Sequence, residues 1–134
     1  IAAIVGPRLF NRLDDAKRRT ASLQISNLSA AVDLYRIDMG HVPTDSEGLD
    51  ALVHAPADQT EWLGPYLARD QIPNDPWGRP YQYSVDARSG AFTIVSFGSD
   101  GQRGGSGSAA DISSQDNAHR RQGVSADTVE RAAP

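Results

Sequence analysis

Two aspartates, Asp100 and Asp111, stand near the ends of a glycine-rich segment that covers residues 97–112 and reads FGSDGQRGGSGSAADI. Calcium binds six to eight oxygen ligands, and carboxylates with backbone carbonyls suit it. Glycines allow the chain to turn tightly and direct its carbonyls inward. The spacing does not match an EF-hand, which carries more acidic residues in a fixed order. The segment therefore predicts a calcium loop, with a plain flexible loop as the alternative.

The same glycines do not match a phosphate-binding loop. A P-loop requires G-x-x-x-x-G-K-S/T at the start of a helix, and a dinucleotide fingerprint requires glycines that open a helix after a first strand. Arg103 is the only cation within the segment, and no long helical pattern follows it. Phosphate binding is not predicted.

The three histidines do not form a catalytic constellation in the sequence. His41, His54 and His119 lie in a helix-exit loop, at a helix end and in the C-terminal tail, without the spacing of metal ligands or of a triad. No nucleophile motif is present either. The sequence predicts a protein that is not an enzyme.

The composition indicates one globular domain. The chain has 134 residues, of which 39% are hydrophobic and 22% charged, and it contains no cysteine. Its net charge of −4 disfavours nucleic-acid binding, because affinity for phosphate backbones comes mainly from Lys and Arg. Disulfides and thiolate metal sites are excluded.

Apolar residues at steps of three, four and seven predict one long helix from about residue 8 to 39. Pro7 suits its first turn and Gly40 its C-terminal cap. At 1.5 Å per residue the helix would be about 45–50 Å long, more than a domain of this size can cover. We therefore expect its first end to protrude.

That first end is rich in charge: it carries five basic residues (Arg8, Arg12, Lys17, Arg18, Arg19) and the acidic pair Asp14 and Asp15. The basic residues could contact anionic lipid head groups. The alternative is a solvated face with i,i+4 pairs, Asp14–Arg18 and Asp15–Arg19. The sequence leaves both open.

The remaining elements are shorter. A capping box at Thr44–Glu47 predicts a second helix that ends before Pro56, and residues 72–80, IPNDPWGRP, predict a rigid connector. Alternating residues at 81–86 and 92–97, joined by a turn at 87–90, predict a β-hairpin. Residues 113–134 are predicted to be a disordered tail. Helices followed by strands indicate an α+β fold, with one helix on an antiparallel sheet.

Several segments together resemble the major pseudopilin of bacterial type II secretion systems, in the type IV pilin superfamily. They are AAIVGPRLF, DLYRIDMGHVPTDSEGLDALV, IPNDPWGRPYQY and SFGSDG…ADI, in the expected order over about residues 1–112. The resemblance implies a pilin-like fold with an N-terminal helix at 1–39, a globular domain at 40–112 and a tail at 113–134. On this interpretation IAAIV is the end of a membrane-anchoring helix that also packs in the filament core.

The resemblance implies a structural subunit of the type II secretion pseudopilus, which helps to export folded proteins across the outer membrane. Its implied partners are other copies of itself, minor pseudopilins, an inner-membrane assembly platform and the inner membrane, with the globular domain in the periplasm. Methylation is a further implied property. The alternatives are a soluble exported calcium-stabilised binding module and a type IV pilus subunit.

The resemblance also implies calcium in the loop after the hairpin. By position, Asp100 and Asp111 match the first and last aspartate ligands, and Phe97 and Gln102 match the carbonyl donors. Family members usually carry another acid just before the last aspartate, where this chain has Ala109 and Ala110. The missing carboxylate should weaken affinity, and Ser108 or water could fill its place.

Overall fold

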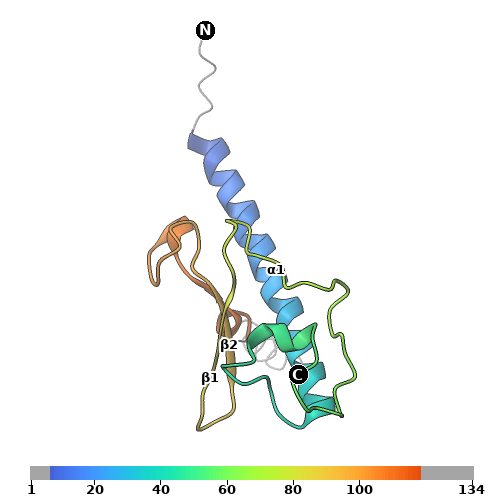
Figure 1. The fold of residues 1–134 in the computed structure, drawn as a ribbon. Coiled ribbons are helices and arrows are strands. Elements are labelled where there is room, and N and C mark those ends of the chain that lie inside the picture. Colours follow the sequence, from blue (N-terminus) through green and yellow to red (C-terminus); the bar gives the residue numbers. More distant parts are fainter. Residues whose placement is uncertain (1–6, 119–134) are drawn as a thin grey trace, which may run out of the picture.

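The computed structural model describes residues 7–118, with side chains from residue 11 onward. In chain order the elements are α1 (Pro7–Met39), the 3₁₀ turn η1 (Gly48–Leu52), β1 (Gln82–Val85), β2 (Phe92–Ser96), the 3₁₀ turn η2 (Gly107–Ala109) and β3 (Ile112–Ser113). Figure 1 shows α1 running along the small sheet, with residues 40–80 wrapped around its C-terminal half. The predicted α+β fold, with one long helix on a small antiparallel sheet, is confirmed.

The long helix buries one stripe of side chains against the sheet and the loops. Its fully buried members follow each other at steps of three and four: Ala21, Ile25, Leu28, Val32, Tyr35. The helix ends where predicted, since Gly40 takes a φ of 81° and its amide donates to the carbonyl of Arg36. Toward its N-terminus α1 extends beyond the sheet, as Figure 1 shows.

The sheet has three antiparallel strands in the order β1-β2-β3. The predicted hairpin is confirmed, with Gln82 opposite Val95 and Val85 opposite Phe92. The third strand was not predicted, because two residues are too few to show a period of two. It pairs with β2 through Ser96 opposite Ile112 and Val95 opposite Ser113.

The predicted capping box forms, but the helix after it is shorter and of another type. The Thr44 amide donates to Oε2 of Glu47 at 3.0 Å, and the Glu47 amide donates to Oγ1 of Thr44 at 3.2 Å. Gly48 then takes a φ of 61°, which an α-helix does not allow. The chain from this residue onward forms the 3₁₀ turn η1, which ends at Leu52.

The ordered domain extends past residue 112, where the sequence placed the start of a disordered tail. Residues 112–113 form β3 and residues 114–118 are helical. The Ile94 amide donates to Oγ of Ser114 at 3.0 Å, and Nδ2 of Asn117 donates to Oγ of Ser26 at 3.2 Å. These long-range contacts, rather than local hydrophobicity, order this polar segment; residues 119–134 lie outside the described range.

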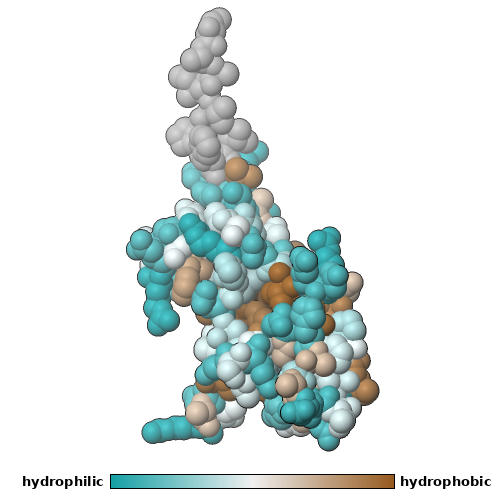
Figure 2. All heavy atoms as spheres, viewed as in Figure 1, coloured by the Kyte–Doolittle hydropathy of each residue, from teal (hydrophilic) through white to brown (hydrophobic). Residues whose placement is uncertain are grey.

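The surface is mixed in character. Figure 2 shows hydrophilic and neutral residues over most of one face, with hydrophobic residues gathered near its middle. Over residues 7–118 the structure contains no helix with both the length and the apolar character that crossing a membrane requires.

Candidate functional site

The loop between β2 and β3 is closed by contacts between its two ends. The Ser99 amide donates to the carbonyl of Ser108 at 3.2 Å. The η2 turn within the loop is closed by the Ala109 amide on the Ser106 carbonyl and by the Ala110 amide on the Gly107 carbonyl. The segment predicted to be either a calcium loop or a flexible loop thus forms a compact turn between two paired strands.

Gly98 is the point of closest approach within this loop. It takes a φ of 71°, and a Cβ placed there would lie 2.8 Å from the carbonyl oxygen of Ala110 and 3.0 Å from that of Ala109. Any side chain at this position would displace the loop's returning end. A glycine is therefore required here for both backbone conformation and space.

Asp111 lies directly before β3 and has one carboxylate oxygen without a partner. Its Oδ2 accepts a hydrogen bond from the Gly104 amide at 3.0 Å. Its Oδ1 is buried, and no group among residues 7–118 bonds to it. A buried carboxylate oxygen without a protein partner is costly, so such an atom calls for a partner from outside the chain, a water molecule or a bound ion.

The other predicted ligands lie around the same loop but are not all directed inward. Phe97 follows β2, Ser108 lies in η2, and the exposed Gln102 lies at the turn. Oδ1 of the exposed Asp100 accepts the amide of Gln102 at 3.0 Å, which is a local turn contact. Within the described range no three acidic or histidine side chains gather into a metal-binding group. The donors present, two carboxylates with carbonyl and hydroxyl oxygens, are hard oxygen donors that fit calcium.

The connector at residues 72–80 supports this loop through Asp75, a buried residue whose role the sequence does not reveal. Its Oδ1 accepts the amides of Trp77 at 3.1 Å and Arg79 at 2.9 Å, and its Oδ2 accepts the hydroxyl of Ser96 at 2.8 Å. Ser96 Oγ in turn accepts the amide of Gly98 at 3.3 Å. An aspartate before Pro-x-Gly often forms such a turn, but its second oxygen is placed only by the fold.

Two arginines hold the loop's two ends. Nη1 of Arg79 donates to the Gly98 carbonyl at 3.2 Å. Nη1 of Arg18, on α1, donates to the carbonyls of Ala110 at 2.7 Å and Ser108 at 3.3 Å. The Asp14–Arg18 and Asp15–Arg19 pairs, which belonged to the solvated-face alternative, do not form as ion pairs in the described structure. Arg18 reaches the loop instead.

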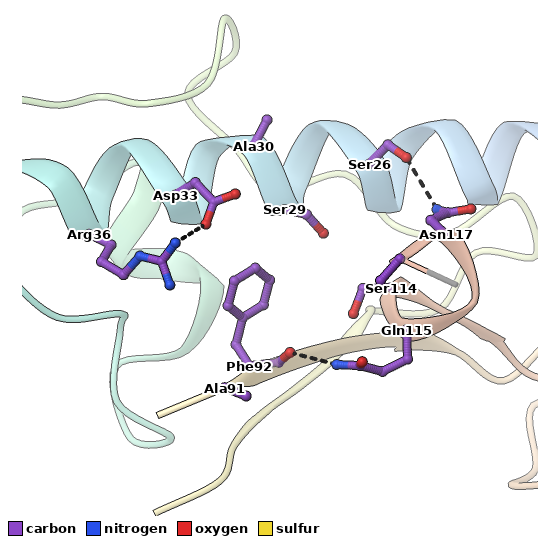
Figure 3. A pocket seen from close by; sticks show the side chains of 11 residues that line it. Ser26, Ser29, Ala30, Asp33, Arg36, Ala91, Phe92, Ser114, Gln115 and Asn117 are labelled. Atoms are coloured by element: carbon purple, nitrogen blue, oxygen red, sulfur yellow. Dashed lines mark hydrogen bonds and ion pairs between the residues drawn. The ribbon is translucent and has the colours of Figure 1, made fainter. Parts of the chain in front are cut away.

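A groove between α1 and the end of the sheet is lined by polar side chains, as Figure 3 shows. Most of these side chains already bond to one another or to the backbone: Arg36 to Asp33, Asn117 to Ser26, and Gln115 to the Phe92 carbonyl. Its polar groups are thus largely occupied in tying residues 114–118 to the helix and the sheet.

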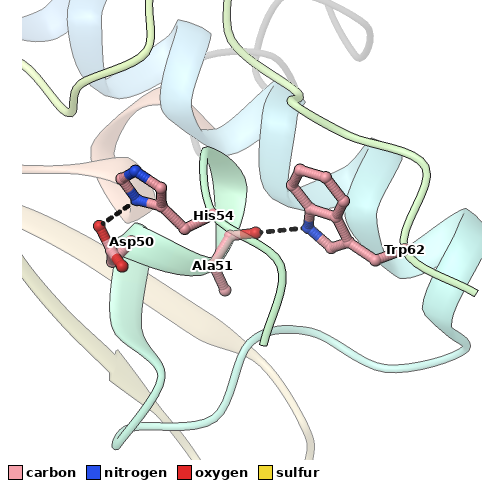
Figure 4. Close-up of polar contacts among 4 residues, drawn as sticks. All are labelled: Asp50, Ala51, His54 and Trp62. Atoms are coloured by element: carbon pink, nitrogen blue, oxygen red, sulfur yellow. Dashed lines mark hydrogen bonds and ion pairs between the residues drawn. The ribbon is translucent and has the colours of Figure 1, made fainter. Parts of the chain in front are cut away.

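The histidines within the described range lie away from both the loop and this groove. Nδ1 of His54 lies 3.0 Å from Oδ1 of Asp50 at the surface, next to the Ala51 carbonyl that accepts the Trp62 indole N–H at 2.8 Å (Figure 4). His41 contacts the ring of Tyr35. His119 lies outside the described residues. Trp62 thus anchors its loop to η1.

The family model described as "Type II secretion system (T2SS), protein G" matches residues 8–115. The chain belongs to this family. A family member from Pseudomonas aeruginosa, named type II secretion system core protein G, is 40% identical over 121 residues, which cover 87% of this chain and 84% of that protein. The Vibrio cholerae protein of the same name is 36% identical over 115 residues, covering 84% and 77%.

A solved structure agrees with the assignment. The crystal structure of the major pseudopilin from the type 2 secretion system of enterohaemorrhagic Escherichia coli superposes with a TM-score of 0.63 at 32% identity, covering 84% of this chain and 97% of that one. The resemblance seen in the sequence is confirmed. Membership of the protein G family makes the chain a subunit of the type II secretion pseudopilus, and neither alternative function is favoured.

Proposed function

We propose that the chain acts without catalysis, as a repeating subunit whose copies assemble through α1. The supporting observation is an apolar stripe on the exposed side of this helix. Leu23, Leu34 and Ile37 are 67%, 53% and 76% exposed, and steps of eleven and three place them on one face. Burying this stripe against a second copy removes apolar surface that one domain cannot cover.

In the proposed assembly, minor pseudopilins and an inner-membrane assembly platform are the other partners. The inner membrane and periplasm are the proposed location, with the protruding N-terminal side of α1 directed toward the membrane. Methylation belongs with these proposals. Family membership supports all of these proposals. The direction in which α1 protrudes supports only the proposed orientation toward the membrane.

The assembly proposal is tested by complementing a secretion-deficient strain with the full-length gene. Ile37→Glu should abolish cross-linked oligomers and reduce export, because a carboxylate cannot be buried between apolar helices. Leu63→Glu is the matched control, since Leu63 is equally exposed at 74% but lies off the helix. Normal oligomers and export with Ile37→Glu, or equal loss with both variants, would contradict assembly through this stripe.

We also propose that calcium binds the loop between β2 and β3. The proposed ligands are the carboxylates of Asp100 and Asp111, the carbonyls of Phe97 and Gln102, and Ser108 in place of the missing acid. The buried, unpartnered Oδ1 of Asp111 supports this assignment. When bound, the ion would supply positive charge to the carboxylates and cross-link the two ends of the loop.

Thermal unfolding with calcium and with chelator tests the metal site. Calcium should raise the melting temperature of the wild type, and Asp100→Ala should abolish the shift, because the loop then keeps one carboxylate. Asp70→Ala, which removes an exposed acid outside the loop, should keep the shift. Identical wild-type melts with calcium and chelator, or a shift that survives Asp100→Ala, would refute the site.

A further inference from the structure

Arg18 connects the charged part of α1 to a loop about 90 residues further along the chain. Its Nη1 donates to two carbonyl oxygens, of Ala110 at 2.7 Å and of Ser108 at 3.3 Å, and both contacts are partly buried. The residue that follows Ala110 is Asp111, whose Oδ1 is buried without a partner. The guanidinium therefore holds the backbone directly beside the loop's least satisfied carboxylate.

The helix itself offers Arg18 other partners than the loop carbonyls. Asp14 and Asp15 lie one turn earlier on the same helix and could pair with Arg18, yet in the described structure neither does. The guanidinium has five donors in a rigid fork, so one arginine can serve two partly buried carbonyls at once. An ion pair with a carboxylate on the solvent-accessible helix surface would contribute little. The Ser108 carbonyl accepts from Ser99 as well, so Arg18 also reinforces the contact that closes the loop.

The opposite end of the loop has a matching support. Arg79 donates to the Gly98 carbonyl at 3.2 Å, and its guanidinium lies so close to Gly101 that a Cβ there would clash with it. One arginine therefore holds the outgoing end of the loop on the connector. The other holds the returning end on the helix.

We propose that Arg18 is a positioning residue that closes the loop against α1 before any ion binds, and so sets the place of Asp111. The anchoring itself needs no metal; its effect on calcium affinity rests on the calcium site proposed above. Copies of the chain are proposed to assemble through α1, and Arg18 joins this helix to the loop. Closure of the loop and assembly through α1 are therefore coupled, and each affects the other to the same extent in free energy.

Amide hydrogen exchange in chelator tests the anchoring without the metal. The amides of Ser99, Gly104, Ala109 and Ala110 should exchange about tenfold faster in Arg18→Ala, because charge-assisted bonds that stabilise the closed loop are lost. Arg19→Ala is the matched control: it removes the same charge from the next residue, whose side chain makes no hydrogen bond or ion pair in the described structure. Equal exchange in both variants would overturn the proposal.

Calorimetric titration with calcium tests the effect on the metal. Arg18→Ala should weaken calcium affinity about tenfold, because calcium binding must then also close the loop. Arg18→Lys should recover part of the lost affinity. Arg19→Ala should not weaken calcium affinity. Affinity that rises in both alanine variants would show that Arg18 acts only as a repelling charge, and would overturn the positioning role. If the wild type binds no calcium, the proposed metal site fails, and the exchange measurement still decides the role of Arg18.

Discussion

Ser96 donates its hydroxyl to Oδ2 of Asp75 at 2.8 Å, and the two residues are only 0% and 4% exposed. Asp75 belongs to the proline-rich connector, and Ser96 is the last residue of β2. Since Ser96 Oγ also accepts the Gly98 amide, the contact joins the connector, the sheet and the start of the β2–β3 loop. A buried carboxylate with every oxygen bonded is therefore the support on which the loop is built.

Replacing Ser96 by alanine should destabilise the fold. The change leaves Oδ2 of Asp75 and the Gly98 amide without their partner in the interior, which costs about 1–3 kcal/mol in free energy of unfolding. Ser84→Ala, on the exposed side of β1, is the matched control and should change little. Urea unfolding measures both variants, and a Ser96→Ala midpoint equal to that of Ser84→Ala would contradict the role of this contact.

Replacing Gly98 by alanine should be more harmful than the same change at Gly104. Both glycines have positive φ, 71° and 89°, so both variants carry the conformational cost of about 1–2 kcal/mol for an L-residue. Only at Gly98 does the new Cβ meet backbone, because nothing lies within 4 Å of a Cβ at Gly104. Thermal unfolding should show the larger loss for Gly98→Ala; equal losses would mean that the close approach is unimportant.

Stability should decline in alkaline solution through the buried tyrosines. Burial, together with the negative charge of Glu47, raises the pKa of Tyr35 from 10.0 to about 12. Above about pH 10 the unfolded chain therefore loses its phenolic proton before the folded chain does, and stability falls until the folded pKa is passed. Below about pH 10 the ionisation of Tyr35 does not make the stability depend on pH.

Tyr35→Phe should make this alkaline decline shallower without changing the slope below about pH 9. Urea unfolding across this range measures the effect. Burial also raises the pKa of Tyr81 and Tyr83, so part of the decline should persist in the variant. A decline as steep as in the wild type would show that Tyr35 does not retain its proton in the folded state.

Much of the fold could be predicted because its signals are local. The steps of three and four along α1, the glycine at its C-terminus and the alternation of the hairpin strands each lie within a few turns of chain. The capping box shows the limit of such signals. Its two hydrogen bonds are encoded by Thr44 and Glu47, but Gly48 has a positive φ that interrupts the α-helical backbone, and only a 3₁₀ turn follows.

The candidate site was only partly predictable. Asp111 was selected from its place at the end of a glycine-rich loop, and its unpartnered oxygen supports that selection. Asp75 was not selected as a functional residue, because a turn motif does not reveal that its aspartate is buried. Its partner Ser96 is 21 residues away, and only the fold brings them together.

The sequence by itself determined the long helix, the hairpin, the family and the place of the loop. The tertiary structure decided which contacts the loop makes: that Arg18 bonds to Ser108 and Ala110 rather than to Asp14, and that β3 forms at all. The physical reason is that a spacing rule compares a residue only with its neighbours in the chain. Carbonyls that are distant in the chain compete for the same guanidinium once packing has brought them close and partly buried the contact.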